Sequence, residues 1–427
     1  MNKALFVTNY FPPMGLGGFL RTLKLAKYLG QYDWQVVVLT VSPKKLYVVD
    51  EHLFNEVLQS DILIERTGKE IKDISKVVTR VPSSSFQKMK KIYSSWVDIP
   101  DSKIGWKNAA LKKADEIWEK YNGFQLIYAS APPFTNLIVA RNIKKKYRVP
   151  LVIDYRHSWT ESTSIKFYPT SFHKKLNENE ERLVVRDADK ILTTNRKIKE
   201  IILSKYNGIK YNDVKLIPRL YDKNDFDAAM KKNLPYTSKM RITYTGSLNS
   251  RGLKLYFKAI KSLVDAMPLY KKQIEFLFLG LVPKNLLRTA KEYGILECLY
   301  MPGYLNHMEF VKYILTSDVL FVHIRNCKNC DGVYPGVLGE YIGSKRNIVA
   351  CIPSENSAVN SVLKSYGAAK VIYDYSPAKI AEAFYDYYKM YESNNLPVPN
   401  EATVTKFEMS PYVYDIARDF NYLVDLE

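Results

Sequence analysis

Short apolar runs alternate with amphipathic stretches along almost the whole chain. The apolar runs have the length of buried strands, and the stretches between them repeat apolar residues at helical spacing. Strands that alternate with helices in this way are typical of parallel sheets that helices cover on both faces. The pattern therefore predicts an α/β protein with doubly wound, Rossmann-like sheets.

The first half of the chain contains a series of such strands. We expect them at Leu5–Thr8, Val36–Thr40, Leu126–Ala129, Leu151–Asp154, Ile191–Thr194 and Val214–Ile217. Helices are predicted between them, for example at Thr135–Tyr147 and Phe172–Asp187. The segment Tyr47–Asp101 has no clean period, so we expect it to be irregular.

The alternation breaks at Pro218–Lys239, which is polar and has no sustained apolar face. We interpret residues 219–239 as a linker between a first domain, 1–218, and a second domain, 240–404. Beyond the break, strands are predicted at Arg241–Tyr244, Ile274–Leu279, Leu299–Met301, Val319–Val322 and Ile348–Cys351. Asn306 with Glu309 predicts a capped start for the helix His307–Thr316.

A last helix is predicted at Pro411–Asp425. Its apolar residues fall on one face, namely Val413, Ile416, Phe420 and Leu423. A helix with one apolar face packs against protein.

Two segments have the order strand, glycine turn, helix. The first, Lys3–Thr22, contains Gly15, Gly17 and Gly18, and the second, Ile242–Ile260, contains Gly246. Glycines let backbone amides approach a ligand, and the N-terminus of the following helix attracts anions. A nucleotide or sugar phosphate is the first interpretation, although Leu20 breaks the dinucleotide fingerprint and a turn without a ligand is the alternative.

The length of 427 residues favours two domains, and no apolar run approaches the roughly 18 residues that span a bilayer. No signal-peptide pattern opens the chain, so we expect a cytoplasmic protein. Cys327 and Cys330 form a lone C-x-x-C without a second ligand pair, which favours a loop or buried thiols over a zinc site.

The formal net charge of +19 lies mostly in the first half, where residues 1–220 hold 38 Lys and Arg against 22 Asp and Glu. Such a charge indicates an anionic partner, a solubility effect or a biased composition. No nucleic-acid-binding motif accompanies it, so we expect no nucleic acid partner. Between Phe86 and Trp96 an apolar stripe with lysines between its members is typical of interfacial helices, with core packing as the alternative.

Several segments, in this order, resemble the GT-B glycosyltransferases, and among them the retaining family 4 type of bacterial surface-polysaccharide synthesis. In the first domain they are FPPMGLGGFLRTLKLAKYL, YASAPPFTNLIVA, PLVIDYRHSW and ERLVVRDADKILTTN. In the second they are YTGSL, GYLNHMEF, SDVLFVHI and YPGVLGEYIGSKRNIVACIP. The resemblance implies two Rossmann-like domains facing across a cleft, with the C-terminal helix, 405–427, returning to the N-terminal domain.

The resemblance also implies that the second domain binds a nucleotide-sugar donor and the first an acceptor. Glu340 matches the second glutamate of the family's E-x7-E pattern and would bind the ribose hydroxyls; a helix-start carboxylate favoured by the dipole is the alternative. The other implied donor-binding residues are Gly17, Gly18, Gly246, Ser247, Arg251, Tyr304, Leu305, Gly336, Val337 and Leu338. Departures from the family pattern stand at Gly332, Val337 and Ser247, so Arg251 is the obvious cation for the diphosphate.

Asp154, Arg156 and His157 end a predicted buried strand at the cleft, where the fold places its catalytic groups. We expect these residues, with Arg251, to form the catalytic set. His157 replaces the usual aspartate, and it would bind a sugar hydroxyl or assist removal of the acceptor proton. A packed histidine is the alternative.

The expected reaction is retaining transfer of a sugar from a nucleoside diphosphate to a glycan or lipid-linked glycan at the inner face of the membrane. We expect no cofactor and no metal, since no D-x-D motif stands out. A nucleotide-sugar epimerase and a non-catalytic carbohydrate-binding protein on the same scaffold are the alternatives.

Overall fold

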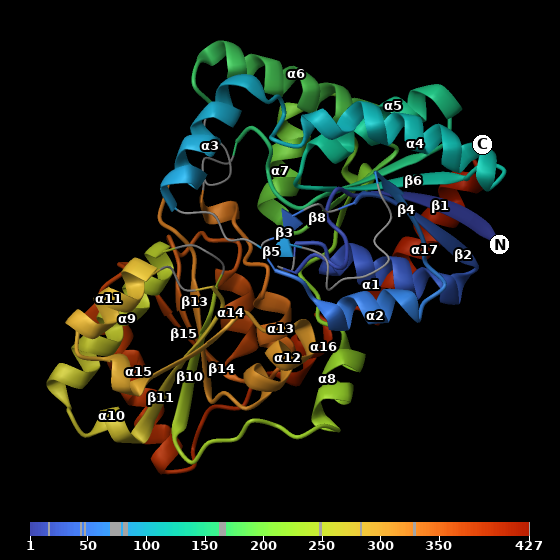
Figure 1. The fold of residues 1–427 in the computed structure, drawn as a ribbon. Helices are drawn as coiled ribbons and strands as arrows, with labels where there is room; N and C mark the ends of the chain where they lie inside the picture. The colour runs from blue at the N-terminus through green and yellow to red at the C-terminus, as the bar shows by residue number, and fades with distance from the viewer. Residues whose placement is uncertain are drawn as a thin grey trace. The chain divides into compact units, whose positions relative to one another are not determined.

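A computed structural model describes residues 1–15, 18–42, 45–46, 48–68, 78–79, 84–161, 168–246, 250–281, 284–327 and 330–426. The chain divides into two compact units. The first consists of Met1–Pro218 with Ser410–Glu427, and the second of Arg219–Met409. Each unit has its own parallel sheet with helices packed on it (Figure 1).

The first unit is built on a seven-stranded sheet in the order β4-β2-β1-β6-β7-β8-β9. The strands are β1 (Asn2–Val7), β2 (Trp34–Val41), β4 (Leu63–Thr67), β6 (Leu126–Ala131), β7 (Leu151–Tyr155), β8 (Lys190–Thr193) and β9 (Val214–Leu216). A separate two-stranded ladder pairs β3 (Lys45–Leu46) with β5 (Val78–Thr79). The central strands β6 and β7 are buried at every residue, because helices cover both faces of the sheet.

The helices of the first unit are α1 (Leu20–Leu29), α2 (Glu51–Leu58), α3 (Ser84–Val97), α4 (Lys107–Lys120), α5 (Thr135–Tyr147), α6 (Ser171–Asp187), α7 (Arg196–Lys205) and α17 (Ser410–Asp425). The last helix, α17, lies beside α1 (Figure 1). Trp34 fixes it there, because its ring meets Phe420 edge to face at 5.5 Å and its indole N–H donates to Asn421 Oδ1 at 2.8 Å. The predicted return of the C-terminal helix is confirmed.

The second unit has a six-stranded sheet in the order β12-β11-β10-β13-β14-β15. The strands are β10 (Met240–Thr245), β11 (Ile274–Leu279), β12 (Leu299–Gly303), β13 (Val319–His323), β14 (Asn347–Cys351) and β15 (Ala369–Ile372). Alternate residues of β11 enter two different cores, since Phe276 and Phe278 face one and Leu277 and Leu279 the other. Both sheets are parallel, so the predicted α/β class is confirmed.

The helices of the second unit are α8 (Lys223–Met230), α9 (Ser250–Ala266), α10 (Tyr270–Gln273), α11 (Lys284–Glu292), α12 (His307–Leu315), α13 (Leu338–Gly343), α14 (Asn360–Tyr366), α15 (Pro377–Glu392) and α16 (Glu401–Thr405). The expected cap of α12 is present, because the Asn306 side chain accepts from the Glu309 N–H at 3.0 Å.

Three sequence expectations need correction. Residues 47–101 are not irregular throughout, since they contain α2, β4 and α3. Residues 219–239 are not a bare linker, because α8 buries Phe226 and Ala229 in a core of the second unit. The chain returns to the first unit only at Ser410, since backbone hydrogen bonds of Tyr221 with Phe407 and Met409 hold the preceding residues in the second.

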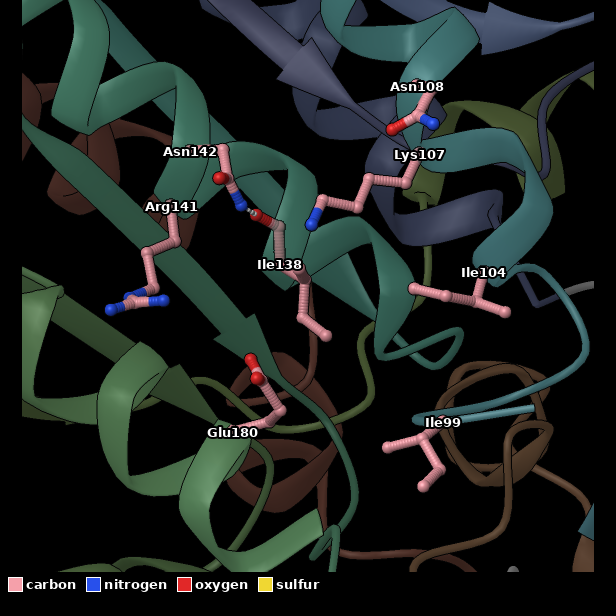
Figure 2. Close-up of a pocket in the computed structure, with 8 residues that line it drawn as sticks. All are labelled: Ile99, Ile104, Lys107, Asn108, Ile138, Arg141, Asn142 and Glu180. Carbon is pink, nitrogen blue, oxygen red and sulfur yellow. Dashed lines mark hydrogen bonds between the residues drawn. The ribbon is translucent and has the colours of Figure 1, made fainter. Parts of the chain in front are cut away.

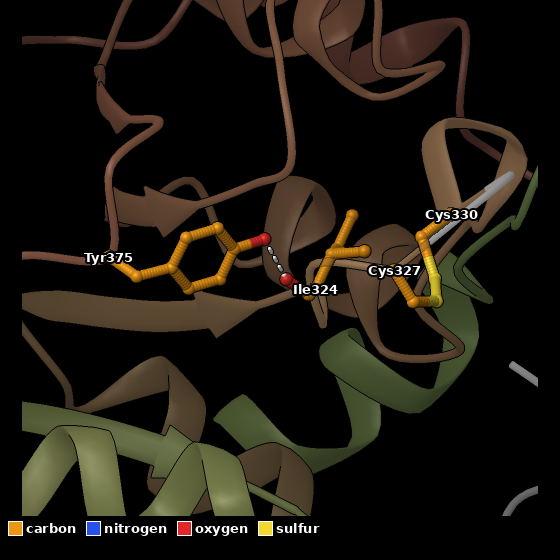
Figure 3. The surroundings of a disulfide bond; sticks show 4 residues. All are labelled: Ile324, Cys327, Cys330 and Tyr375. Carbon is orange, nitrogen blue, oxygen red and sulfur yellow. Dashed lines mark hydrogen bonds between the residues drawn. A yellow bond between two sulfur atoms is a disulfide. The ribbon is translucent and has the colours of Figure 1, made fainter.

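Cys327 and Cys330 form a disulfide in the segment between β13 and α13 (Figure 3). The two cysteines lie in a connecting segment, as the loop interpretation expected, but free thiols need correction, because their Cα atoms are 5.3 Å apart, within bridging distance. The Tyr375 hydroxyl donates to the Ile324 carbonyl at the start of the same segment. Cys298 and Cys351 are buried and unpaired by disulfides.

In the part of the chain that the structure describes, every helix is too short or too polar to span a bilayer.

Candidate functional site

In the second unit, the strand order reverses between β10 and β13. The next strand in sequence after β10 is β11 on one side, whereas β13 is followed by β14 on the other side. Loops that leave adjacent strands in opposite directions open a crevice at their carboxyl ends, which is where ligands bind in open α/β sheets. The segments that border this position are the start of α9 and the stretch that leads into α13.

Two glycines set the position of α13. A Cβ at Gly339 would lie 2.7 Å from the backbone of Arg219 and Leu220, and a Cβ at Gly343 would collide with the ring of Tyr221. One face of α13 therefore packs directly on the chain segment that enters the second unit.

A buried tyrosine joins α13 to the end of β10. The Tyr341 hydroxyl donates to Thr245 Oγ1 at 2.8 Å and accepts from the Thr245 N–H at 3.1 Å. This contact and the glycine face place Glu340 at the border of the crevice.

Glu340 is a buried carboxylate, with 8% of its surface exposed. No described residue donates a hydrogen bond to its Oε2 atom. Burial raises the pKa of this carboxyl, while His307 and Arg219 act in the opposite direction. A buried carboxylate oxygen without a donor is costly, so the site is suited to a ligand that brings hydroxyl groups.

His307 lies near Glu340 and is itself held in place. Its Nε2 atom donates to Asp225 Oδ2 at 2.8 Å, which joins the start of α12 to α8. Asp225 and His307 are both buried. The negative charge of Glu340 is thus surrounded by side chains of fixed position.

The other predicted donor-binding residues near β12 and α13 differ in burial and in their backbone hydrogen bonds. Tyr304 and Leu305 follow β12 and are half-buried. Val337 precedes the first residue of α13, and the Leu338 N–H donates to the Pro335 carbonyl at 3.3 Å. The amide of Leu338 is therefore engaged within the chain. Gly336 has open space around its Cα.

At the β10 side, the Gly246 N–H donates to the Leu279 carbonyl at 3.1 Å. This amide therefore continues the hydrogen bonding of the sheet. Arg251 is the second residue of α9, and the structure describes its backbone only. Ser247, like Gly17 of the first unit, lies outside the described residues.

The sequence reasoning missed two residues at the floor of the crevice, Tyr244 and His323. A Cβ at Gly252 would collide with the Tyr244 hydroxyl and lie 2.9 Å from His323 Nδ1, so both side chains reach the first turn of α9. Burial lowers the pKa of His323 to about 4, which keeps the imidazole neutral at neutral pH. The available signal was position alone, since Tyr244 lies near the end of β10 and His323 ends β13.

In the first unit, Asp154 is fully buried and every polar contact it makes is internal. Tyr128 and Ser130 donate to its Oδ2 atom at 3.0 and 3.2 Å, and Arg21 pairs with its Oδ1 atom at 3.0 Å. An atom that is closed to solvent touches no substrate, so we assign Asp154 to positioning. Arg21 was missed by the sequence reasoning, although it is the second residue of α1, the helix that follows the glycine turn.

Arg156 has a similar role. Its guanidinium donates to the carbonyls of Ala131, Pro132 and Gly18, so it ties the end of β6 to the glycine turn. The side chain is 4% exposed, and its hydrogen bonds shape the turn rather than reach outward. His157, the next residue, is half-buried and follows the carboxyl end of β7.

A separate cavity of about 440 Å³ lies within the first unit (Figure 2). Its lining residues are Ile99, Ile104, Lys107, Asn108, Ile138, Arg141, Asn142 and Glu180. Two of its polar groups are engaged, because Arg141 Nε donates to Asp187 and Asn142 Nδ2 donates to the Ile138 carbonyl, both at 2.7 Å. None of the predicted site residues lines this cavity.

The two parallel sheets and the returning helix define the class of the protein, which is the GT-B fold of two Rossmann-like domains. No protein-family model matches the chain, and no curated protein matches it in sequence.

The fold is similar to that of several solved structures. Sucrose-phosphate synthase of Thermosynechococcus elongatus is 12% identical, with full coverage of both chains and a TM-score of 0.68. Anabaena HepE in complex with UDP is 13% identical, with 99% of this chain and 100% of that chain covered and a TM-score of 0.62. The UDP-GlcNAc 2-epimerase of Neisseria meningitidis, bound to UDP-GlcNAc, is 12% identical, with coverages of 97% and 98% and a TM-score of 0.57.

Proposed function

We propose that this protein is a glycosyltransferase that moves a sugar from a nucleoside diphosphate to an acceptor hydroxyl. The observation that carries the proposal is Glu340, a buried carboxylate with an oxygen that no described residue satisfies. A ribose presents two adjacent hydroxyl donors, which suit the two oxygens of one carboxylate. The similar structures that contain UDP or UDP-GlcNAc support a nucleotide or nucleotide sugar as the ligand.

The leaving diphosphate needs positive charge or hydrogen-bond donors as the glycosidic bond breaks. We assign this role to Arg251 and to the N-terminus of α9, a helix long enough to carry a full dipole. Tyr244 and His323 reach the same first turn and offer a hydroxyl and an imidazole. These groups would supply the hydrogen bonds that basic side chains make in the resembled family, where this chain has Ser247 and Val337 instead.

The acceptor hydroxyl loses a proton during transfer, and we assign the removal of this proton to His157, which is half-buried after the carboxyl end of β7. Arg156 joins the end of β6 to the Gly18 turn, so its proposed contribution is to hold the backbone of the acceptor side in place. We propose transfer with retention of configuration by attack on the same face of the sugar.

We also propose that neither a metal ion nor another cofactor takes part, so activity should persist in EDTA.

The proposed acceptor is a glycan or lipid-linked glycan of surface-polysaccharide synthesis, used at the cytoplasmic face of a membrane. The positive charge of residues 1–220 supports an anionic acceptor or surface.

An epimerase acting on the nucleotide sugar is the second candidate, because the fold is also similar to that of the UDP-GlcNAc 2-epimerase. The two functions differ in their products. An epimerase converts the nucleotide sugar without an acceptor, whereas a transferase releases the nucleoside diphosphate and labels the acceptor.

The test begins with thermal shift and calorimetry of the purified protein against UDP, GDP, ADP and TDP and their sugars. A ligand that binds the native state raises the melting temperature, by an amount set by its concentration relative to its Kd. Donors that bind are then incubated with a membrane extract, and radiolabel from the sugar is followed into lipid-linked products. Binding of no nucleotide would overturn the proposal, and conversion of the sugar without an acceptor would favour the epimerase.

A further inference from the structure

The helix α3 exposes a continuous apolar face. Met89, Ile92, Tyr93, Trp96 and Val97 follow one another at helical spacing, and each is between 54% and 68% exposed. Core packing, the alternative for the stripe predicted between Phe86 and Trp96, is excluded for its members Met89, Tyr93 and Trp96, whereas the side chain of Phe86 lies outside the described residues. An apolar surface of this kind on a folded protein marks an interaction site.

A second helix extends the same surface. Phe172, in the first turn of α6, is 66% exposed, and its neighbour His173 meets the Trp96 ring edge to face at 5.4 Å. His173 Nε2 donates to the Trp96 carbonyl at 3.1 Å, while Nδ1 accepts from the Thr170 hydroxyl at 2.7 Å. The end of α3 is thereby fixed to the start of α6, as their neighbouring positions in Figure 1 show. We call these exposed apolar residues of α3 and Phe172 the α3–α6 patch.

The sequences of both helices that form the patch contain lysines. The sequence of α3 contains Lys88, Lys90 and Lys91 and no acidic residue, and Lys174 and Lys175 follow Phe172 on α6. Lys175 is exposed, and Lys174 pairs with Glu178 at 3.3 Å. Lysines beside exposed tryptophan and tyrosine are the composition of a helix that lies in the interface of an anionic bilayer.

We propose that the α3–α6 patch docks the protein on an anionic lipid surface. The apolar side chains enter the boundary between headgroups and acyl chains, and the lysines pair with lipid phosphates. A second protein copy fits the apolar residues but not the run of lysines, which would meet like charge in a symmetric contact. The inference deepens the proposed function by naming the surface that carries the acceptor, but its evidence is independent of the donor site.

The test is flotation of the full-length protein with vesicles of phosphatidylcholine, with and without phosphatidylglycerol. Wild-type protein should float with the anionic vesicles and remain below with the neutral ones. The double variant Ile92→Ser with Trp96→Ser should lower partitioning by about 10- to 100-fold, because two exposed apolar side chains no longer enter the bilayer. Each of Lys90→Gln and Lys91→Gln should lower it by about fivefold.

The matched control is Leu269→Ser with Val398→Ser, two apolar residues of the second unit that are 78% and 86% exposed. This variant should float like the wild type. Trp96 emission, isolated as the difference between wild type and Trp96→Phe, should shift to the blue on anionic vesicles.

Three results would overturn the proposal. They are equal flotation of wild type and patch variant, no preference for anionic lipid, and a wild-type dimer that the patch variant converts to monomer. Nucleotide binding by the patch variant separates the two proposals, because its affinity for the nucleoside diphosphate that the wild type binds should equal that of the wild type whether or not the protein floats. Failure of both proteins to bind any of the four nucleoside diphosphates would count against the proposed function alone.

Discussion

The Glu340 carboxylate has one oxygen, Oε2, that is buried and accepts no hydrogen bond from any described residue. A carboxylate in this state destabilises the unliganded protein, which is why burial raises its pKa. Groups of this kind persist at binding sites, where a ligand supplies the missing hydrogen bonds. At the residue scale, the Glu340 charge therefore lowers the stability of the unliganded protein and strengthens the binding of a ligand.

Glu340→Gln tests this opposition. The variant removes a buried charge, so its free energy of unfolding at neutral pH should rise by about 1–3 kcal/mol. UDP binding should weaken by about 10- to 100-fold, because a hydrogen bond to a charged group contributes about 1.5–3 kcal/mol. Urea unfolding and calorimetry measure the two effects.

The pH dependence of binding gives a second check on Glu340. Since its folded pKa is raised, the carboxylate gains a proton as the pH falls through that value, and UDP binding of the wild type should weaken on the acid side. The Gln variant should lack this step. A variant that is destabilised and still binds UDP would show that Glu340 has a purely structural role.

His323 predicts a different pH effect, on stability alone. Its folded pKa of about 4 lies below the ordinary 6.5, so the unfolded chain binds a proton in this range and the folded chain does not. The contribution of the neutral imidazole to the free energy of unfolding is fully present above pH 6.5. It should be lost as the pH drops toward 4, by up to about 3 kcal/mol. Urea unfolding across this range should show a flatter slope for His323→Gln.

The control is the difference in unfolding free energy between His323→Gln and wild type at neutral pH. Because His323 does not titrate there, this difference reports only the change in packing. An unchanged slope between pH 6.5 and pH 4 would contradict the assignment of a buried, neutral imidazole.

At the element scale, α13 shows how backbone contacts position the site. Its glycine face approaches Arg219, Leu220 and Tyr221 at distances that leave no space for a side chain. The sequence indicated a helix start near Glu340, but the spacing of the glycines did not reveal which segment they contact. Residues 219–221 lie more than a hundred positions earlier in the chain, so a local pattern cannot predict this contact.

Gly339→Ala should move this helix. A Cβ that lies 2.7 Å from three backbone atoms overpacks the contact, and we expect a loss of about 1–3 kcal/mol in stability and weaker nucleotide binding. Gly336→Ala is the matched control, because no atom lies within 4 Å of its added Cβ, and it should change stability by less than about 0.5 kcal/mol. Equal effects of both changes would refute the role of the glycine face.

At the scale of the whole molecule, the chain leaves the first unit after Pro218 and returns to it at Ser410. The return is stabilised by α17, whose Val413, Ile416 and Phe420 are buried. Lys215 Nζ adds a hydrogen-bonded ion pair with Asp419 Oδ2 at 2.7 Å. The first unit is therefore incomplete until the end of the chain has been made.

Phe420→Ala tests this dependence. The side chain is fully buried against Trp34, and its removal should cost the first unit about 3–5 kcal/mol. Hydrogen exchange should show lost protection in β1 and β2, with the strands of the second unit unchanged. The control is Tyr422→Ala, which removes a 64% exposed ring of the same helix and should have little effect.

The sequence by itself determined most strands of the two sheets, the parallel class and the apolar face of the last helix, because each rests on local periodicity. It missed β4, whose run Leu63–Thr67 contains Glu65 and Arg66, β15 at the edge of the second sheet, and α8, which lies in a polar stretch. These elements are stabilised by tertiary contacts, such as the ion pairs of Glu65 with Lys113 and Lys120 at 2.9 and 2.6 Å.

Only the tertiary structure decided what the candidate residues do. It assigned Asp154 and Arg156 to internal hydrogen bonds, brought Tyr244 and His323 to the start of α9, and left Glu340 with an unsatisfied oxygen. It also exposed the stripe of α3 that the sequence allowed as core. The physical reason is the same in each case, since periodicity records which side of an element is apolar, whereas burial and hydrogen bonding depend on segments that meet only after folding.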